Sequence, residues 1–440
     1  MPNTLLALAW IVAGGGSIPE LNQVSIEQDL ADAERVLAGV TGAPGELLFA
    51  SGPGDRTVQI SGRPSPLLPA DAVRASLASL FDPRGGRTAT YRPTILRPIG
   101  PATADRLLAS LEAALTDAAR RPLTVYLAGH GQMGPNPRDN WVDLWEESAL
   151  TPISVARALE RHPGHRTVRF VITSCHSGGF GELAFAGADP ALGPATTDRC
   201  GLFAAPWDLP ASGCDPNPDR AAHEGYARHF LPALAAGKSL LEAHTEVRVT
   251  SPAPDVPTTT SERWLRHSAP TDSTAATKAF ALPEEDRVVE ALTDRLGVKP
   301  RAASDALKAL EASIDALDAE RRIGQPDEDA AWRRASASVL ARWPVLNDPW
   351  HPDFEGALEA NRADIKRHLA RDPAVVLWRS ARRALDEIDM KIWDLRDRSA
   401  PLERLARAVE TRDLAARLHA QGGPDWTHYL RLLECERGQP

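Results

Sequence analysis

The chain has 440 residues, of which 43% are hydrophobic and 25% charged, and its formal net charge is −9. A chain of this length has room for two or three domains, each with its own core. The acidic balance argues against nucleic acid as a partner, because phosphate binding requires a concentrated basic surface. No run approaches the ~20 apolar residues of a membrane span, so we expect no membrane partner either.

The beginning of the chain imitates a secretory signal, because Leu5 to Ala13 is apolar and small residues follow. However, no Lys or Arg precedes this run, and residues 24–37 continue at once into an amphipathic pattern. A buried strand ending at Gly14, followed by a helix from about Ser25 to Ala38, explains these residues better. We therefore expect a cytoplasmic protein. Secretion is the alternative if the apolar start is a signal peptide.

Strand and helix patterns alternate up to about residue 270. After a second strand at Glu46 to Ser51, residues 52–101 form an insertion rich in Pro, Gly and Arg, with one helical segment from Asp71 to Phe81. The remaining patterns predict strands at 123–129, 140–145, 167–174 and 201–205, and helices at 103–120, from Thr151, at 221–234 and at 240–249. This order favours the α/β class, with a mostly parallel sheet and helices on both of its faces.

The strand signal ends near residue 270, and helical patterns fill the rest of the chain. Their polar faces mix acidic residues with arginine, as solvated helices do. We interpret residues 1–270 as an α/β domain and residues 271–440 as an all-α carboxy-terminal domain that regulates it or recruits partners. The expected helices are 284–296, 302–323, 329–343, 356–370, 374–397 and 400–420.

Four cysteines, Cys175, Cys200, Cys214 and Cys435, are too few and too scattered for a disulfide framework. Cys200 and Cys214 could pair in an oxidising compartment, or bind a metal together with His223. No pair of ligands has the short C-x-x-C spacing of a zinc site, however. We interpret both as ordinary thiols and expect no metal.

Two of the predicted strands end at a reactive side chain. The strand that begins at Leu123 stops at His130-Gly131, and a later strand stops at Cys175. Because the carboxyl ends of parallel strands share one edge of a sheet, we expect the thiol and the imidazole side by side, as nucleophile and base. The N–H groups of Gly131 and Cys175 would then stabilise the oxyanion. His176 projects in a different direction from its neighbour, so we do not expect it to be the base.

The residues around these two positions carry a family resemblance. Tyr126 to Gly131 and Ile172 to Phe180 resemble the two catalytic motifs of the caspase-hemoglobinase clan of cysteine peptidases, and the second is similar to metacaspase and bacterial caspase-like versions. The histidine precedes the cysteine by 45 residues, close to the ~50 of the caspase signature. The resemblance covers roughly residues 5 to 265, and the helical remainder resembles no family that we can name.

The resemblance implies a three-layer α/β/α sandwich and an endopeptidase that cleaves protein or peptide substrates without a cofactor. It assigns His130 as base, Cys175 as nucleophile and the Gly131 N–H to the oxyanion hole. Clan relatives are often made as zymogens, so we expect cuts by the protein itself or by an activating protease at 189–199 or 213–220.

One residue departs from the family pattern. Metacaspases and legumain carry an acidic residue two positions before the cysteine, whereas this chain has Thr173. A buried carboxylate would pair bidentately with guanidinium, so we expect cleavage after Arg, with Asn- or Asp-directed cleavage as the alternative. Each acidic candidate for the pocket is also explained as an ordinary turn or helix-cap residue. The candidates are Asp208, Asp215, Asp219 and Glu224.

The sequence therefore predicts a regulated bacterial cysteine endopeptidase whose helical domain binds a partner protein. Two alternatives remain open. One is an inactive caspase-like scaffold that acts only through interactions, and the other is acyl or amide transfer by the same Cys-His pair.

Overall fold

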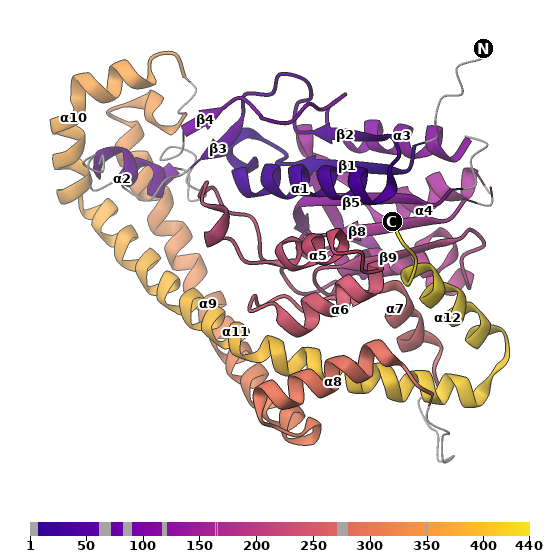
Figure 1. Ribbon diagram of the computed structural model, residues 1–440. Helices are drawn as coiled ribbons and strands as arrows, with labels where there is room; N and C mark the ends of the chain where they lie inside the picture. Colours follow the sequence, from indigo (N-terminus) through magenta and orange to yellow (C-terminus); the bar gives the residue numbers. More distant parts are fainter. Residues whose placement is uncertain are drawn as a thin grey trace, which may run out of the picture.

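The computed structural model describes residues 8–60, 72–81, 90–116, 121–162, 164, 166–270, 280–348 and 351–440. At its centre is an eight-stranded sheet in the order β10-β9-β8-β5-β1-β2, with β6 and β7 attached beside β5. Figure 1 labels the strands from β9 to β2. The path from β2 to β9 is parallel, whereas β10, β6 and β7 pair in antiparallel fashion. The strands are β1 (Trp10–Gly15), β2 (Gly45–Phe49), β5 (Leu123–Gln132), β6 (Trp141–Leu144), β7 (Ser148–Leu150), β8 (Val168–Ile172), β9 (Arg199–Phe203) and β10 (Thr258–Thr259).

Helices cover both faces of the sheet. Successive side chains of a strand point to opposite faces. In β1, Trp10 and Val12 therefore join the core under one helical layer, while Ile11 and Ala13 join the core under the other. The first layer contains α1 (Val24–Thr41), α5 (Tyr226–Ala235) and α6 (Leu240–Thr250), and the second contains α3 (Ala104–Thr116) and α4 (Pro152–Arg161). Burial on both sides explains why these strands are nearly continuous apolar runs.

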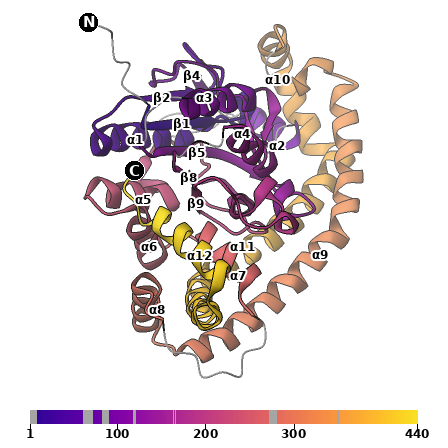
Figure 2. The same ribbon diagram turned by 90° about the vertical axis from the view of Figure 1, so that its right-hand side faces the viewer.

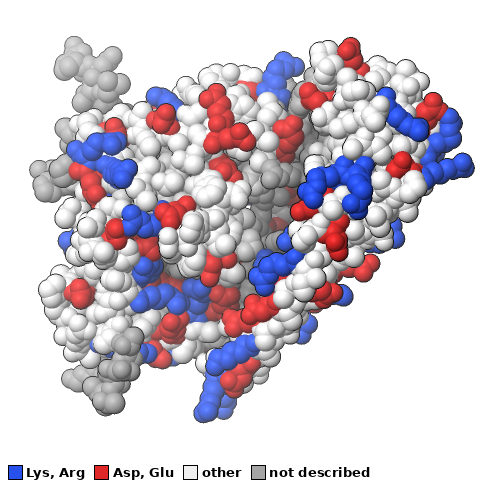
Figure 3. All heavy atoms as spheres, turned by 180° about the vertical axis from the view of Figure 1, so that it is seen from behind, with Lys and Arg blue, Asp and Glu red and all other residues white. Residues whose placement is uncertain are grey.

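A long helical arm projects from this α/β part. It consists of α9 (Pro300–Leu340) and α11 (Pro373–Gln421), which run side by side in Figures 1 and 2, with α10 (Phe354–Arg371) at the far end. The insertion reaches this end, because Val73 and Leu77 of α2 (Ala72–Phe81) share a core with Trp378 of α11. On the face seen in Figure 3, Lys and Arg are interspersed with Asp and Glu along the arm.

The last helices return to the sheet. After α7 (Thr260–Ser268) and α8 (Pro283–Leu296), the chain forms the arm and then α12 (Gly423–Glu436), which packs against α7 and β9. Tyr429 and Leu433 of α12 belong to the same core as β1 and α1. Helices from both ends of the chain therefore stabilise one core. None of the described helices is long and apolar enough to cross a bilayer.

Two predicted helix breaks are wrong. The sequence suggested separate helices at 302–323 and 329–343, and at 374–397 and 400–420, but each pair is one continuous helix, α9 with Pro326 inside it and α11 with Pro401 inside it. A proline removes one helical hydrogen bond and crowds the preceding turn. Packing of the two long helices against each other outweighs that local cost. The helix prediction for 71–81 is confirmed from Ala72 onward, and Asp71 lies outside the described residues.

Candidate active site

His130 lies near the carboxyl end of β5, and Cys175 follows the neighbouring strand β8 at the matching position. β5 and β8 pair with Leu127 opposite Ile172, and each reactive residue comes three positions later. A Cβ atom on Gly131 would lie 2.0 Å from the Cys175 carbonyl oxygen, so only glycine permits this approach of the two chain segments. The fold therefore brings the predicted base and the predicted nucleophile to the same edge of the sheet.

The imidazole of His130 is oriented by the segment before α1. Its Nε2 lies 2.7 Å from Gln23 Oε1 and 3.2 Å from the Leu21 carbonyl oxygen. A carbonyl oxygen can only accept, so Nε2 carries the proton and Nδ1 is the nitrogen able to receive one. We did not identify Leu21 or Gln23 from the sequence. Leu21 acts through its backbone carbonyl, which leaves no trace in the identity of its residue, and Gln23 is 107 residues from His130 in sequence.

The Cys175 sulfur is held between the backbone groups of one residue. The Ala211 N–H donates to Sγ at 3.3 Å, and Sγ lies 3.4 Å from the Ala211 carbonyl oxygen, which can accept the thiol proton. Burial raises the pKa of the Cys175 thiol above its usual value; the Ala211 N–H opposes this shift, and the negative charge of Asp255 adds to it. The resting sulfur is therefore a thiol, and attack on a carbonyl requires a base.

Residues 209–215, which we call the covering segment, lie across this edge of the sheet. Three hydrogen bonds hold the covering segment to different parts of the fold, so it is an ordered part of the resting structure. They run from the His176 N–H to the Leu209 carbonyl oxygen (3.0 Å), from the Ser212 N–H to Asp255 Oδ1 (2.6 Å) and from the Asp215 N–H to Ser25 Oγ (2.7 Å). Cys175 itself is partly exposed, and Ala211 of the covering segment contacts its sulfur.

A small pocket lined by acidic and basic residues lies near the candidate nucleophile. Thr173 borders it together with Asp29, a buried residue of α1. Arg220 enters the pocket and places Nη2 2.6 Å from Asp29 Oδ1 and 3.4 Å from Asp32 Oδ2. Burial raises the pKa of Asp29 to about 6, although Arg220 opposes the shift. The cavity volume is about 10 Å³, close to the least that can hold one water molecule.

The acidic candidates chosen from the sequence lie elsewhere or play other parts. Glu224 borders the same pocket, but its carboxylate is exposed and lies 3.2 Å from His229 Nε2. Asp208 lines a separate cavity of about 330 Å³ between the sheet loops and the arm. Asp215 and Asp219 accept backbone N–H groups two residues ahead, as turn and cap residues do.

The buried acid of this pocket is Asp29, which we missed. It stands on the buried face of α1 with Ile26, Leu30 and Ala33. A carboxylate on the apolar face of an amphipathic helix is a usable sequence signal, because such a group is rarely buried without a partner.

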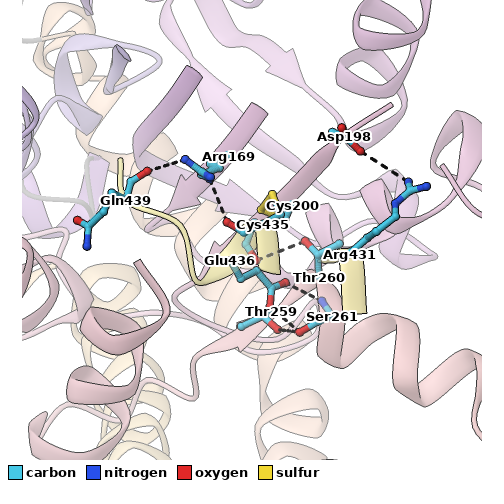
Figure 4. The surroundings of a disulfide bond; sticks show 11 residues. Arg169, Asp198, Cys200, Thr259, Thr260, Ser261, Arg431, Cys435, Glu436 and Gln439 are labelled. Atoms are coloured by element: carbon cyan, nitrogen blue, oxygen red, sulfur yellow. Dashed lines mark hydrogen bonds and ion pairs between the residues drawn. A yellow bond between two sulfur atoms is a disulfide. The ribbon is translucent and has the colours of Figure 1, made fainter. Parts of the chain in front are cut away.

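The interpretation of Cys200 as an ordinary thiol, or as a partner of Cys214, is wrong. Cys200 of β9 forms a disulfide with Cys435 of α12, across 235 residues of sequence (Figure 4). Cys214 is free and exposed as a residue, with Sγ turned toward the Gly129 carbonyl oxygen at 3.9 Å. The spacing of the cysteines hid the true pair, because only the return of α12 to the sheet brings it together.

Comparisons with known proteins assign no family. The chain matches no protein-family model, and the search of curated proteins found no relative. Within the described ranges, no three His, Cys, Asp or Glu side chains are grouped so that they could hold a metal ion. The geometry of the residues at the edge of the sheet is therefore the basis on which a function can be assigned.

Proposed function

We propose that the protein is a cysteine endopeptidase with Cys175 as nucleophile and His130 as general base. The observation that carries the proposal is the adjacency of the two strand ends, with the Nε2 of His130 already bound to the Leu21 carbonyl. The motifs that resemble the caspase-hemoglobinase clan point to the same reaction. An α/β sheet with reactive groups at its carboxyl edge is compatible with that clan and with other folds.

The reaction would follow from this arrangement. Nδ1 of His130 takes the Cys175 proton, Sγ attacks the peptide carbonyl, and the N–H groups of Gly131 and Cys175 stabilise the oxyanion. The protonated imidazole then passes its proton to the leaving amine, and water hydrolyses the thioester. Because the resting thiol has a raised pKa, the reaction depends on this base.

The contact between Asp29 and Arg220 supports a preference for cleavage after basic residues, with Arg preferred. The pocket beside Thr173 already accepts a guanidinium group, which is the side chain that a substrate arginine would offer. A planar guanidinium and a carboxylate can form two parallel hydrogen bonds, which gives such a pocket its selectivity. A substrate would first have to displace Arg220.

Activation would then require release of the covering segment. Of the two predicted cleavage regions, 213–220 ends at Arg220 itself, and a cut there would free both the segment and the pocket. The arginine of the other region is unsuitable, because Arg199 is buried in β9 and bound to Glu160. We therefore place the activating cut, by the protein itself or by another protease, at 213–220.

The protected sulfur favours a second candidate function. Cys175 is held by Ala211 beneath the covering segment, as it would be in a protein that has lost activity and acts as a scaffold. In that case the helical arm would present the functional surface to a partner protein.

A peptide panel separates these candidates. Reporter peptides that end in Arg, Lys, Asn or Asp are incubated with wild type, Cys175→Ala and Cys214→Ala, before and after a limited proteolytic cut. We expect release after Arg, loss of at least about 1000-fold in Cys175→Ala, and retention in Cys214→Ala, which keeps the proposed nucleophile. No turnover by wild type in either state would favour the scaffold. Mass spectrometry of the products identifies acyl transfer.

A further inference from the structure

A third cavity lies at the opposite end of the sheet from Cys175. Its volume is about 310 Å³, and it is enclosed by the residues that lead into β8 and β9 and by α12. Three arginines from these three elements line it: Arg169, Arg199 and Arg431. We call it the arginine cavity. Figure 4 shows Arg169 and Arg431 on either side of the Cys200–Cys435 disulfide.

Arg199 is the most deeply placed of the three, with 2% of its surface exposed. Its Nε donates to the Leu183 carbonyl, and its Nη2 donates to Glu160 and to the Phe185 carbonyl. Nη1 has no acceptor among the described residues. A buried charged donor without a partner costs free energy that a bound oxygen atom would recover.

The other two arginines are weakly neutralised. Arg169 donates to the carbonyl oxygens of Cys435 (3.0 Å) and Gln439 (2.5 Å) and forms no ion pair with a described carboxylate. Arg431 lies 3.8 Å from Asp198, and about half of each side chain is exposed. A long, exposed ion pair of this kind contributes little free energy, so Arg431 can turn to another anion at small cost.

The lining holds three arginines and two carboxylates, and a third carboxylate, Glu160, pairs with Arg199 from outside the lining. Asp198 and Glu434 are its carboxylates, and both are exposed. His428 is neutral at pH 7, because burial lowers its pKa to about 4. The hydroxyl of Thr197, also in the lining, has no hydrogen-bond partner among the described residues and is a further donor.

We propose that the arginine cavity binds a phosphate-type oxyanion, either inorganic phosphate or the phosphate group of a small molecule. Guanidinium groups from β8, β9 and α12 would surround it, and their planar donors match the oxygens of a tetrahedral anion. The volume leaves room for more than the anion itself. Because the three donors belong to the sheet and to α12, the bound anion would fasten this helix to the sheet.

Calorimetric titration of the full chain with inorganic phosphate and with glycerol phosphate tests this site. Chloride at matched ionic strength measures general screening. We expect saturable binding of at least one phosphate and a melting temperature that rises with its concentration, because a ligand of the folded state stabilises it. Tighter binding of the ester than of the free ion would identify a phosphorylated small molecule as the natural ligand.

Arg431→Gln is the deciding variant, because this exposed side chain can be replaced without disturbing the fold. It should weaken binding at least tenfold, the usual worth of one charge-assisted hydrogen bond. Arg398→Gln is the matched control: Arg398 is an exposed arginine of α11 that does not line the cavity. Absence of saturable binding by wild type, or equal affinity in Arg431→Gln and wild type, would overturn the proposal.

Discussion

The two ends of the sheet treat their charged groups in opposite ways. At the carboxyl end, the chain fills its own site: Ala211 holds the Cys175 sulfur, and Arg220 occupies the pocket of Asp29. At the other end, Arg199 keeps a buried nitrogen without an acceptor among the described residues. The charged groups of one end are thus paired within the chain, whereas a buried donor of the other end is not.

Of the changes that test this difference, loss of the disulfide should have the largest effect, because this bond links α12 to the sheet beside the arginine cavity. Replacing Cys200 and Cys435 with serine should cost about 5 kcal/mol, since the bond closes a loop of 235 residues. Calorimetric unfolding of the double variant measures the loss, and Cys214→Ser, which removes a free thiol, is the control. If reductant leaves the melting temperature of wild type unchanged, the bond does not hold α12 in place.

Glu436 should make the stability of the folded chain dependent on pH. It is fully buried, accepts the Ser261 N–H at 2.7 Å, and burial raises its pKa from 4.5 to about 8. Between these values the folded state binds more protons than the unfolded state, so stability falls as the pH rises. From pH 5 to 8 the free energy of unfolding should fall by on the order of 4 kcal/mol in wild type. This fall should be absent in Glu436→Gln.

Urea unfolding of wild type and variant across this pH range isolates the effect of Glu436, because other titrating groups are common to both proteins. Glu434→Gln, at an exposed position of the same helix, should show the wild-type dependence of unfolding free energy on pH. If the free energy of unfolding changes with pH equally in Glu436→Gln and wild type, this carboxyl is not the proton-binding group.

The smallest of the three effects concerns selectivity at the carboxyl end. If the proposed function is correct, Asp29→Asn should lower kcat/KM for Arg peptides about 100-fold, the worth of a bidentate carboxylate-guanidinium pair. Asp32→Asn should change it by less than about threefold, because Asp32 is one-third exposed and more distant from Arg220. Equal losses in the two variants would mean that the substrate side chain binds elsewhere.

The central strands could be predicted from sequence, because their apolar runs are long and glycine marks their ends. β1, β5 and β8 lie within or close to their predicted ranges, and the placement of His130 and Cys175 at one edge of the sheet followed from the rule that parallel strands end at one edge. These features depend on short stretches of chain, so the order of residue types within each stretch is enough to predict them.

The features that were missed depend on distant segments. Arg220 meets Asp29 across nearly 200 residues, and Cys200 meets Cys435 across 235. The helix around Pro401 continues because α11 packs against α9, which outweighs the local preference of proline. These contacts join segments that are distant in sequence, so no local pattern of residue types reveals them.

The Cys200–Cys435 bond has a consequence for any cut made at Arg220. Cys200 precedes that position and Cys435 follows it, so both products of the cut would stay joined by one covalent bridge. The nicked protein would migrate as a single species on a non-reducing gel and as two fragments after reduction. Proteolysis would then change the connectivity of the chain without changing its mass by more than one water molecule, and the helical arm would remain attached to the sheet.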